Sequence, residues 1–351
     1  MEKQLSIILF SHRRPDFLLR FLKCYNRLNF KYNLIIGYGG KDILSKAIHD
    51  EIKKNKKIVY KKFNNEFNFK KNEYDINKFF IRRLKCLRMV KTKYVKFICD
   101  DDFIIDYTTK KCVKFLNKNK NYIAAGGSFI NYELHKKYYG RFINLSHGYI
   151  IKSNTSNDKF KRIKQYYENA GDTFNCVFRT NDLIKIHLIS SKFNCKDDYL
   201  KYHHFENVVH LYGKIKYFKQ PIIFHENHND WHEGSGTEWV EKIKSNYFIK
   251  HLETLSVNIN NNFKLKDPKL VENLYYKKFI IKDLAKINSK NYHNIKDIFK
   301  YIKILFVTKI KYYKKLFFLK NIDTQKFITK TFNSQIVNES LKYEIFLKNN
   351  D

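Results

Sequence analysis

Short apolar runs alternate with segments of helical spacing over about the first 230 residues. Residues 5–10 (LSIILF) form an unbroken apolar run, which is typical of a buried strand, and residues 16–28 have the apolar spacing of a helix. Further strands are predicted at 33–37, 58–62, 94–99, 122–130, 173–179, 215–218 and 221–224, and further helices at 43–54, 76–90, 108–117 and 197–212, the last with Gly213 as its C′ residue. This alternation predicts an α/β fold with a mostly parallel sheet flanked by helices.

The character of the sequence changes near residues 235–245. Beyond residue 238 there is no glycine and one proline, and lysine, asparagine and aromatic residues recur at helical spacing. We therefore predict two regions, an α/β domain over residues 1–238 and a basic, aromatic-rich helical extension over residues 239–351. Residues 296–320 combine an apolar face with many lysines, so this helix can pack on a core or lie on an anionic membrane.

The charge of the chain is strongly positive. There are 69 Lys and Arg residues against 34 Asp and Glu, a formal net charge of +35, which favours anionic partners such as nucleic acid, a membrane surface or phosphorylated substrates. Lys, Asn, Ile, Tyr and Phe are abundant together, and the composition of an AT-rich genome explains part of this excess. The basic residues are spread along the chain without a nucleic-acid-binding motif, so no nucleic-acid partner is expected.

Cysteine usage and the N-terminal sequence point to the cytoplasm. None of the six cysteines forms a CxxC pair and most lie in apolar runs, which predicts buried, reduced thiols. The first residues lead directly into a strand and lack the pattern of a signal peptide. No apolar stretch approaches the roughly 20 residues of a membrane span. We expect a cytoplasmic protein, with peripheral association with the inner face of a bacterial inner membrane through residues 296–320.

Three adjacent carboxylates, Asp100, Asp101 and Asp102, follow the predicted strand at residues 94–99. Adjacent carboxylates repel one another, and Mg²⁺ or Mn²⁺ is commonly held by such oxygens together with substrate phosphates. Ligands of open α/β sheets bind beyond the carboxyl ends of strands. The run therefore predicts a divalent-cation site, with a solvated turn as the alternative. Strand alternation predicts that Asp100 and Asp102 share one side and that Asp101 faces away.

Three segments in this order resemble the GT-A glycosyltransferases, specifically family 2-type enzymes of bacterial surface-polysaccharide synthesis. Residues 7–18 (IILFSHRRPDFL) are similar to the opening strand and turn of that family, residues 91–104 (KTKYVKFICDDDFI) to its acidic strand, and residues 175–180 (NCVFRT) to an acceptor-side segment. The resemblance implies a GT-A, Rossmann-like fold. It also implies inverting, Mn²⁺- or Mg²⁺-dependent transfer of a sugar from a nucleotide-diphosphate donor to a saccharide or lipid-linked acceptor, in capsule or lipopolysaccharide synthesis.

The resemblance also implies roles for individual residues. Asp102 would ligate the metal ion, and Asp100 would bind the donor ribose or the metal through water. Relatives carry an aspartate after the second strand that contacts the base, and since this chain lacks it there, Tyr38 or Asp42 would substitute. The implied donor-binding residues are Ser11, Arg13, Arg14, Tyr38, Asp42, Asp100 and Asp101, and the implied acceptor-binding residues are Asn175 and Arg179.

The general base and a further metal ligand are expected later in the chain. Relatives supply the base from an acidic residue at the start of a late helix, which favours Asp198, with Asp197 and Glu206 as alternatives; helix capping is the competing role for the two aspartates. In metal-dependent relatives a late histidine can join the metal, so the resemblance favours His225, with His228 second. The histidines match no standard zinc signature, and hydrogen bonding alone is the alternative for them.

Two other functions compete with glycosyl transfer. A metal-dependent nucleotidyltransferase would need its paired carboxylates on a hairpin after a glycine–serine turn, which the sequence does not contain. A basic nucleic-acid-binding protein without catalysis would bind with an affinity that falls steeply with salt. The chain also lacks the GxxxxGK[ST] and GxGxxG patterns of P-loop and dinucleotide-binding proteins.

The basic segment 296–320 predicts membrane association that can be measured by flotation. The protein should float with vesicles that contain anionic lipid at low ionic strength, because lysines near the surface are attracted to anionic head groups. Flotation should weaken in high salt, where the charges are screened, and should be absent with uncharged phosphatidylcholine vesicles. Protein that stays in the soluble fraction at low salt contradicts the prediction.

Overall fold

The computed structural model describes residues 4–40, 43–63, 67–68, 73–134, 142–147, 151–169, 173–226, 246–265, 267–275, 334–336, 338–339 and 342–343. Its strands are β1 (Leu5–Ser11), β2 (Asn33–Tyr38), β3 (Ile58–Lys62), β4 (Phe67–Asn68), β5 (Glu73–Tyr74), β6 (Tyr94–Cys99), β7 (Asp102–Ile104), β8 (Tyr122–Leu134), β9 (Phe142–His147), β10 (Val177–Arg179) and β11 (Lys214–Glu226). Its helices are α1 (Pro15–Arg27), α2 (Lys46–Lys53), α3 (Ile76–Arg88), α4 (Asp106–Lys118), α5 (Lys159–Asn169), α6 (Thr180–Ser191), α7 (Asp198–Tyr212), α9 (Asn246–Phe263) and α10 (Leu270–Tyr275).

The described strands form one large mixed sheet and one small hairpin. The large sheet has the order β3-β2-β1-β6-β10-β8-β11-β7, with β9 paired to β8, while β4 pairs with β5. Strands β3, β2, β1 and β6 are mutually parallel, so their carboxyl ends lie at one edge. Strand β10 runs antiparallel to its neighbours β6 and β8, and β7 runs antiparallel to β11. The predicted α/β class is confirmed, with a parallel half joined to a mixed half.

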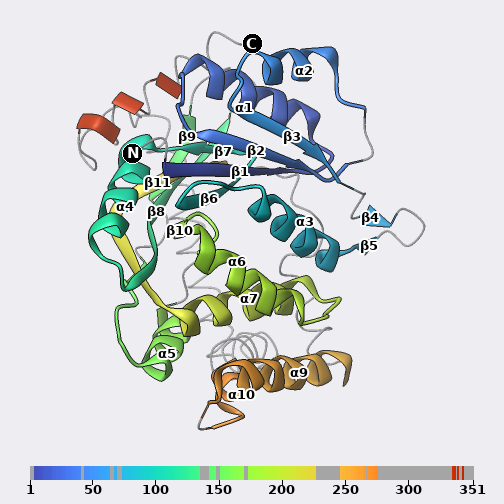
Figure 1. The fold of residues 1–351 in the computed structure, drawn as a ribbon, viewed down its shortest axis with the longest axis vertical. Helices are drawn as coiled ribbons and strands as arrows, with labels where there is room; N and C mark the ends of the chain where they lie inside the picture. The colour runs from blue at the N-terminus through green and yellow to red at the C-terminus, as the bar shows by residue number, and fades with distance from the viewer. Residues whose placement is uncertain are drawn as a thin grey trace, which may run out of the picture.

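Helices cover both faces of the sheet (Figure 1). Alternate residues of β1 contact different layers: Ile7 and Leu9 belong to the apolar cluster that contains residues of α1, α2 and α4, and Ile8 and Phe10 belong to the cluster with residues of α3, α6 and α7. Every residue of β1 is therefore buried. Burial on both faces explains why its sequence is an unbroken apolar run instead of an alternating one.

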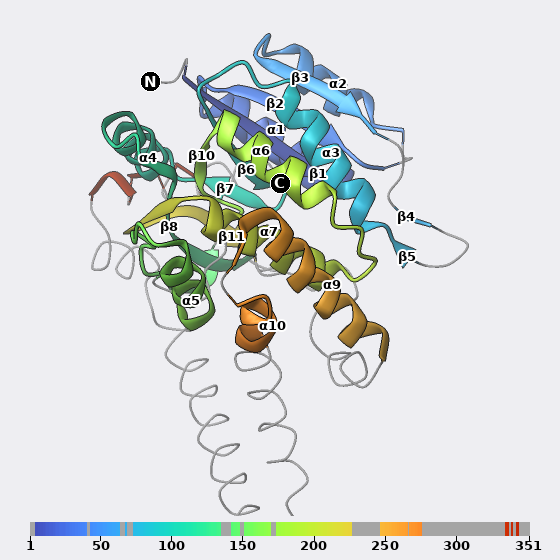
Figure 2. The ribbon, with the colours of Figure 1, turned by 60° about the horizontal axis from the view of Figure 1, so that its bottom comes forward.

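The helix α9 packs on the α/β domain (Figure 2). Its residues Leu252, Leu255 and Ile259 are fully buried in the same apolar cluster as Ile8 of the central strand, and α9 lies against α7. The described part of the helical extension thus shares a core with the α/β domain. None of the helices within the described ranges has both the length and the apolar character needed to cross a membrane.

Residues close to the C-terminus contact the strand that carries Asp102. Glu339 accepts hydrogen bonds from the backbone N–H groups of Asp106 (2.5 Å) and Tyr107 (2.7 Å), which open α4. A carboxylate at this place satisfies two of the unpaired N–H groups of a helix N-terminus. Tyr343 donates to the carbonyl of Ile104 at the end of β7. These two side chains fix the junction between β7 and α4.

Several elements differ from the sequence-based prediction. The runs expected at 215–218 and 221–224 are one strand, β11, whose pairing with β8 shifts register around Pro221, because proline cannot donate to the ladder. Gly213 is the cap residue of α7 but is extended (φ −167°), not left-handed. Its Cβ would lie 2.4 Å from a methyl carbon of Ile123, so close packing explains the glycine. Helices α5 and α6 and strands β7 and β9 were not predicted.

The contact of residue 343 with β7 predicts a measurable loss of stability when its side chain is removed. Tyr343→Ala should lower the free energy of unfolding by about 3 kcal/mol, the usual cost of truncating a buried aromatic residue. The neighbouring exposed residue provides the control, because Lys342→Ala should change stability by less than about 0.5 kcal/mol. Urea unfolding measures both. A Tyr343→Ala protein as stable as the wild type would contradict the contact.

Candidate donor and metal site

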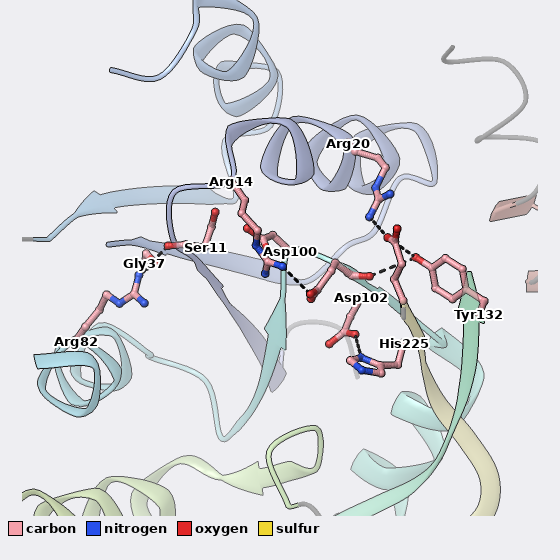
Figure 3. A network of polar contacts seen from close by, with 11 residues as sticks. Ser11, Arg14, Arg20, Gly37, Arg82, Asp100, Asp102, Tyr132 and His225 are labelled. Atoms are coloured by element: carbon pink, nitrogen blue, oxygen red, sulfur yellow. Dashed lines mark hydrogen bonds and ion pairs between the residues drawn. The ribbon is translucent and has the colours of Figure 1, made fainter. Parts of the chain in front are cut away.

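The carboxylate run lies between β6 and β7 and beside β1 and β11 (Figure 3). Strand β6 ends at Cys99, Asp100 and Asp101 form a turn, and Asp102 begins β7. The register places Cys99 beside Phe10 of β1, and Asp102 opposite His225 of β11. Because of the turn, the strand alternation that predicted an outward-facing Asp101 does not apply. Since β6 is parallel to β1 and the carboxylates follow its last residue, the site lies at the carboxyl edge of the parallel strands, where ligands of such sheets bind.

Arg14 forms ion pairs with two of the carboxylates. It is the N-cap residue of α1 and forms ion pairs with Asp100 and, at 2.8 Å, with Asp101. The three aspartates are only 1%, 8% and 2% exposed. Burial raises the pKa of Asp100 to about 7, while the charge of Arg14 acts in the opposite direction. The prediction that Asp101 faces away is thus wrong, because its carboxylate shares Arg14 with that of Asp100.

Asp102 has a separate partner. Its Oδ1 lies 2.8 Å from Nδ1 of His225, which the antiparallel pairing of β7 with β11 places opposite it. Burial raises the pKa of Asp102, and the hydrogen bond with His225 lowers it. The imidazole is partly exposed and its edge contacts the ring of Phe129. The structure thus brings together two of the residues that the family resemblance assigned to the metal ion, and His228 lies outside the described residues.

The donor atoms at this place fit a divalent cation. Ligand atoms of Cys99, Asp101 and Asp102 all lie within 4.8 Å of one another. Carboxylate oxygens are the ligands that Mg²⁺ and Mn²⁺ prefer. Burial raises the pKa of Cys99 well above its usual range, so this residue carries a neutral thiol beside the carboxylates. The carboxylates of Asp101 and Asp102 are therefore the stronger candidates for holding the ion.

Arg82 of α3 is a residue that the sequence did not single out. Its Nη1 donates to the carbonyl oxygens of Ser11 and Gly37, both at 2.8 Å, and its side chain is almost completely buried. It ties together the carboxyl ends of β1 and β2. The Cβ of any larger residue at Gly39 would lie 2.5 Å from this guanidinium. The pattern of residues 76–90 indicates a basic amphipathic helix, but not which of its cations turns inward.

The other predicted donor residues have different positions. Ser11 is buried at the end of β1, and Arg13 is exposed beside it with a positive φ of 56°. Tyr38 is 0% exposed and packs in the core, 6.4 Å from the ring of Tyr60. The ring of Tyr38 belongs to the apolar layer of this structure, and its contact with a base stays a prediction. Asp42 lies outside the described residues.

The three base candidates belong to α7. Asp197 caps the helix by accepting from the backbone N–H of Leu200 (2.9 Å), and Asp198 accepts from that of Tyr199 (2.8 Å). Glu206 accepts a hydrogen bond from the hydroxyl of Thr173 (2.8 Å). Helix α7 packs on the sheet face opposite α1, whereas Arg14 of α1 holds the carboxylate turn. Asp197 therefore has the helix-capping role that the sequence offered as the alternative to catalysis.

The predicted acceptor residues have structural partners. Arg179 donates to the carbonyl oxygens of Tyr122 (2.8 Å), Leu116 (2.6 Å) and Asn119 (3.0 Å), and thereby closes the C-terminal end of α4. The carbonyl of Asn175 accepts from the buried Lys96 of β6. Arg179 thus has structural contacts at the end of strand β10, which lies between β6 and β8, and its acceptor role stays a prediction.

Comparison with known proteins gives a structural likeness only. No family model matches the chain, and no curated protein matches it by sequence. A crystal structure of S. aureus TarS is 11% identical with a TM-score of 0.45, over 78% of this chain and 43% of that chain. The TarS 1–349 structure is 12% identical (TM-score 0.48; 86% and 78%), and its complex with UDP-GlcNAc is 14% identical (TM-score 0.46; 78% and 73%).

The hydrogen bonds of Arg179 predict a stability defect when its side chain is removed. Arg179→Ala should lower the free energy of unfolding by about 2 kcal/mol, because it leaves carbonyl groups at the end of α4 without their charged donor. Lys185→Ala, an exposed cation of α6, is the matched control and should be near neutral. Chemical denaturation measures both. If Arg179→Ala is as stable as the wild type, the structural role is contradicted. Weaker binding of saccharide acceptors by such a stable variant would support the acceptor role instead.

Proposed function

We propose that this chain is a metal-dependent glycosyltransferase that moves a sugar from a nucleotide-diphosphate donor to a saccharide or lipid-linked acceptor. The observation that carries the proposal is the meeting of Asp100, Asp101 and Asp102 with Arg14 and His225 at the carboxyl edge of parallel strands. A buried carboxylate cluster beside an arginine can bind a cation and a diphosphate together. The three sequence segments that resemble GT-A enzymes include these carboxylates and this arginine.

The residues at the site have complementary tasks. A bound Mg²⁺ or Mn²⁺ would neutralise charge on the diphosphate leaving group. Asp101 and Asp102 would hold the ion, and His225 would orient Asp102 or join it as a ligand. Arg14 pairs with Asp100 and Asp101 here, and once a cation neutralises these carboxylates, its guanidinium can turn to a phosphate oxygen, whose geometry it matches.

Asp198 is the residue we propose as the general base. A base must lie within hydrogen-bonding reach of the acceptor hydroxyl and be ionised near neutral pH. All three candidates already accept a hydrogen bond, Asp198 from the backbone N–H of Tyr199, so the choice of Asp198 rests on its place as the first residue of α7, where the resemblance puts the base. Deprotonation of the acceptor for a single displacement would invert the configuration at the transferred sugar.

The biological setting that we propose is synthesis of capsule or lipopolysaccharide at the inner face of the bacterial membrane. The net charge of +35 suits an anionic or lipid-linked acceptor at a membrane surface. Residues 296–320, which we expect to make the membrane contact, lie outside the described residues.

The proposal predicts a specific loss of activity in one variant. Asp102→Asn keeps the size of the side chain but removes the charge that would hold the cation, so Mn²⁺-dependent sugar transfer and donor hydrolysis should fall by at least about 100-fold. Asp50→Asn, an exposed carboxylate on α2, is the matched control and should retain full activity. Activity would be measured with a panel of nucleotide sugars, with Mn²⁺ and with EDTA. Equal activity in Asp102→Asn and wild type would overturn the metal assignment.

A further inference from the structure

A second polar network adjoins the carboxylate turn, and the sequence motifs do not include it (Figure 3). Glu226 ends strand β11, directly after His225, and its carboxylate forms an ion pair with Arg20 of α1. The hydroxyl of Tyr132, from β8, lies 3.2 Å from Oε2 of the same carboxylate. Neighbouring residues of a strand face opposite sides, so His225 contacts Asp102 while Glu226 points to α1.

The network is buried, so its members depend on one another. Tyr132 is 0% exposed and Glu226 is 6% exposed. A buried carboxylate is costly without a partner, and the guanidinium of Arg20 supplies one. Arg20 itself lies over the rings of Phe17 (4.8 Å) and Phe103 (5.5 Å). Burial raises the pKa of Tyr132 well above its usual range, so the phenol keeps the proton that it donates.

Tyr132 connects this network to the main chain of the carboxylate turn. Its hydroxyl also lies 3.3 Å from the carbonyl oxygen of Asp101, so one proton is shared between that carbonyl and Glu226. Its ring stacks on Phe103, the residue after Asp102, at 5.9 Å. Two arginines of α1 and its N-cap thus contribute to the turn. Arg14 contacts the carboxylates directly, and Arg20 is connected to the backbone through Glu226 and Tyr132.

We propose that Glu226 is a positioning residue that, with Arg20 and Tyr132, fixes the backbone of Asp101 and so aims the carboxylates of Asp101 and Asp102 at a common point. The inference rests on the proposed function, because that point is where the cation of the donor complex would bind. Glu226 does not touch the reacting atoms. Its role is to keep two mutually repelling carboxylates in a binding geometry before the ion arrives, which lowers the cost of binding.

The test measures Mn²⁺ affinity and stability in the same variants. Tyr132→Phe removes only the hydroxyl and keeps the ring on Phe103, and Glu226→Gln removes the charge that pairs with Arg20. Each should weaken Mn²⁺ binding by about 10-fold or more, the usual effect of losing a partner of metal ligands. The free Mn²⁺ concentration in a titration, followed by electron paramagnetic resonance, gives the dissociation constant, and thermal unfolding shows that each variant is folded.

Two matched variants separate positioning from general destabilisation. Tyr25→Phe removes an equally buried hydroxyl that donates to a backbone carbonyl, that of Tyr32, at 2.8 Å. Glu51→Gln removes a largely buried carboxylate that pairs with Lys54. Both variants should bind Mn²⁺ as tightly as the wild type, even where their melting temperatures fall as much as that of Tyr132→Phe.

The outcomes distinguish this inference from the proposed function. Mn²⁺ binding that is weakened in Tyr132→Phe and Glu226→Gln but not in the two controls supports the positioning role. Wild-type affinity in both network variants overturns that role and leaves the proposed function intact, as does an equal loss of affinity in Tyr25→Phe. A wild-type protein that binds no Mn²⁺, alone or with nucleoside diphosphate, overturns the metal-dependent function itself.

Discussion

Repulsion among three adjacent buried carboxylates is the constraint on which the rest of the site depends. Asp100, Asp101 and Asp102 lie at the junction of β6 and β7 with almost no exposure to water, and charges in such a place need partners. Arg14 forms ion pairs with the first two and His225 contacts the third, but one guanidinium carries a single positive charge, so negative charge remains at the turn. A cluster that is only partly neutralised by the chain itself is suited to bind a further cation, and through that cation an anionic substrate.

The residues that contact or support the carboxylate turn come from distant parts of the chain. The turn after β1 provides Arg14, the pairing of β7 with β11 provides His225, and α3 provides Arg82, which joins the ends of β1 and β2. Tyr343, near the C-terminus, holds the end of β7. Within the described residues, Ile336 and Tyr343 share an apolar cluster with Phe103 and Ile105, so the geometry of the sheet edge depends on contacts between residues far apart in the chain.

The sequence predicted those parts of the fold and site in which the spacing of apolar residues along the chain indicates which residues are buried. Strands β1, β2 and β6 are buried runs, and the position of the carboxylates at a strand end followed from them. Helix α6 was missed because its buried face includes Thr180, His187 and Ser190, which weakens the apolar period. Local sequence also does not tell whether an arginine faces a ligand or backbone carbonyls, as Arg179 shows. The contact between Arg20 and Glu226 joins residues 206 positions apart, and no local pattern reports it.

The most direct test of this account is the thermal stability of the protein with nucleoside diphosphates and Mn²⁺. A ligand that binds only the folded state stabilises it by about 2.7 kcal/mol at 100 times its dissociation constant, so a bound donor nucleotide raises the melting temperature. We predict that one of UDP, GDP or CDP raises it with Mn²⁺, and that EDTA or Asp102→Asn abolishes the shift. No shift with any of the three, or a shift that survives both EDTA and Asp102→Asn, would contradict the assignment of the carboxylate turn as a donor and metal site.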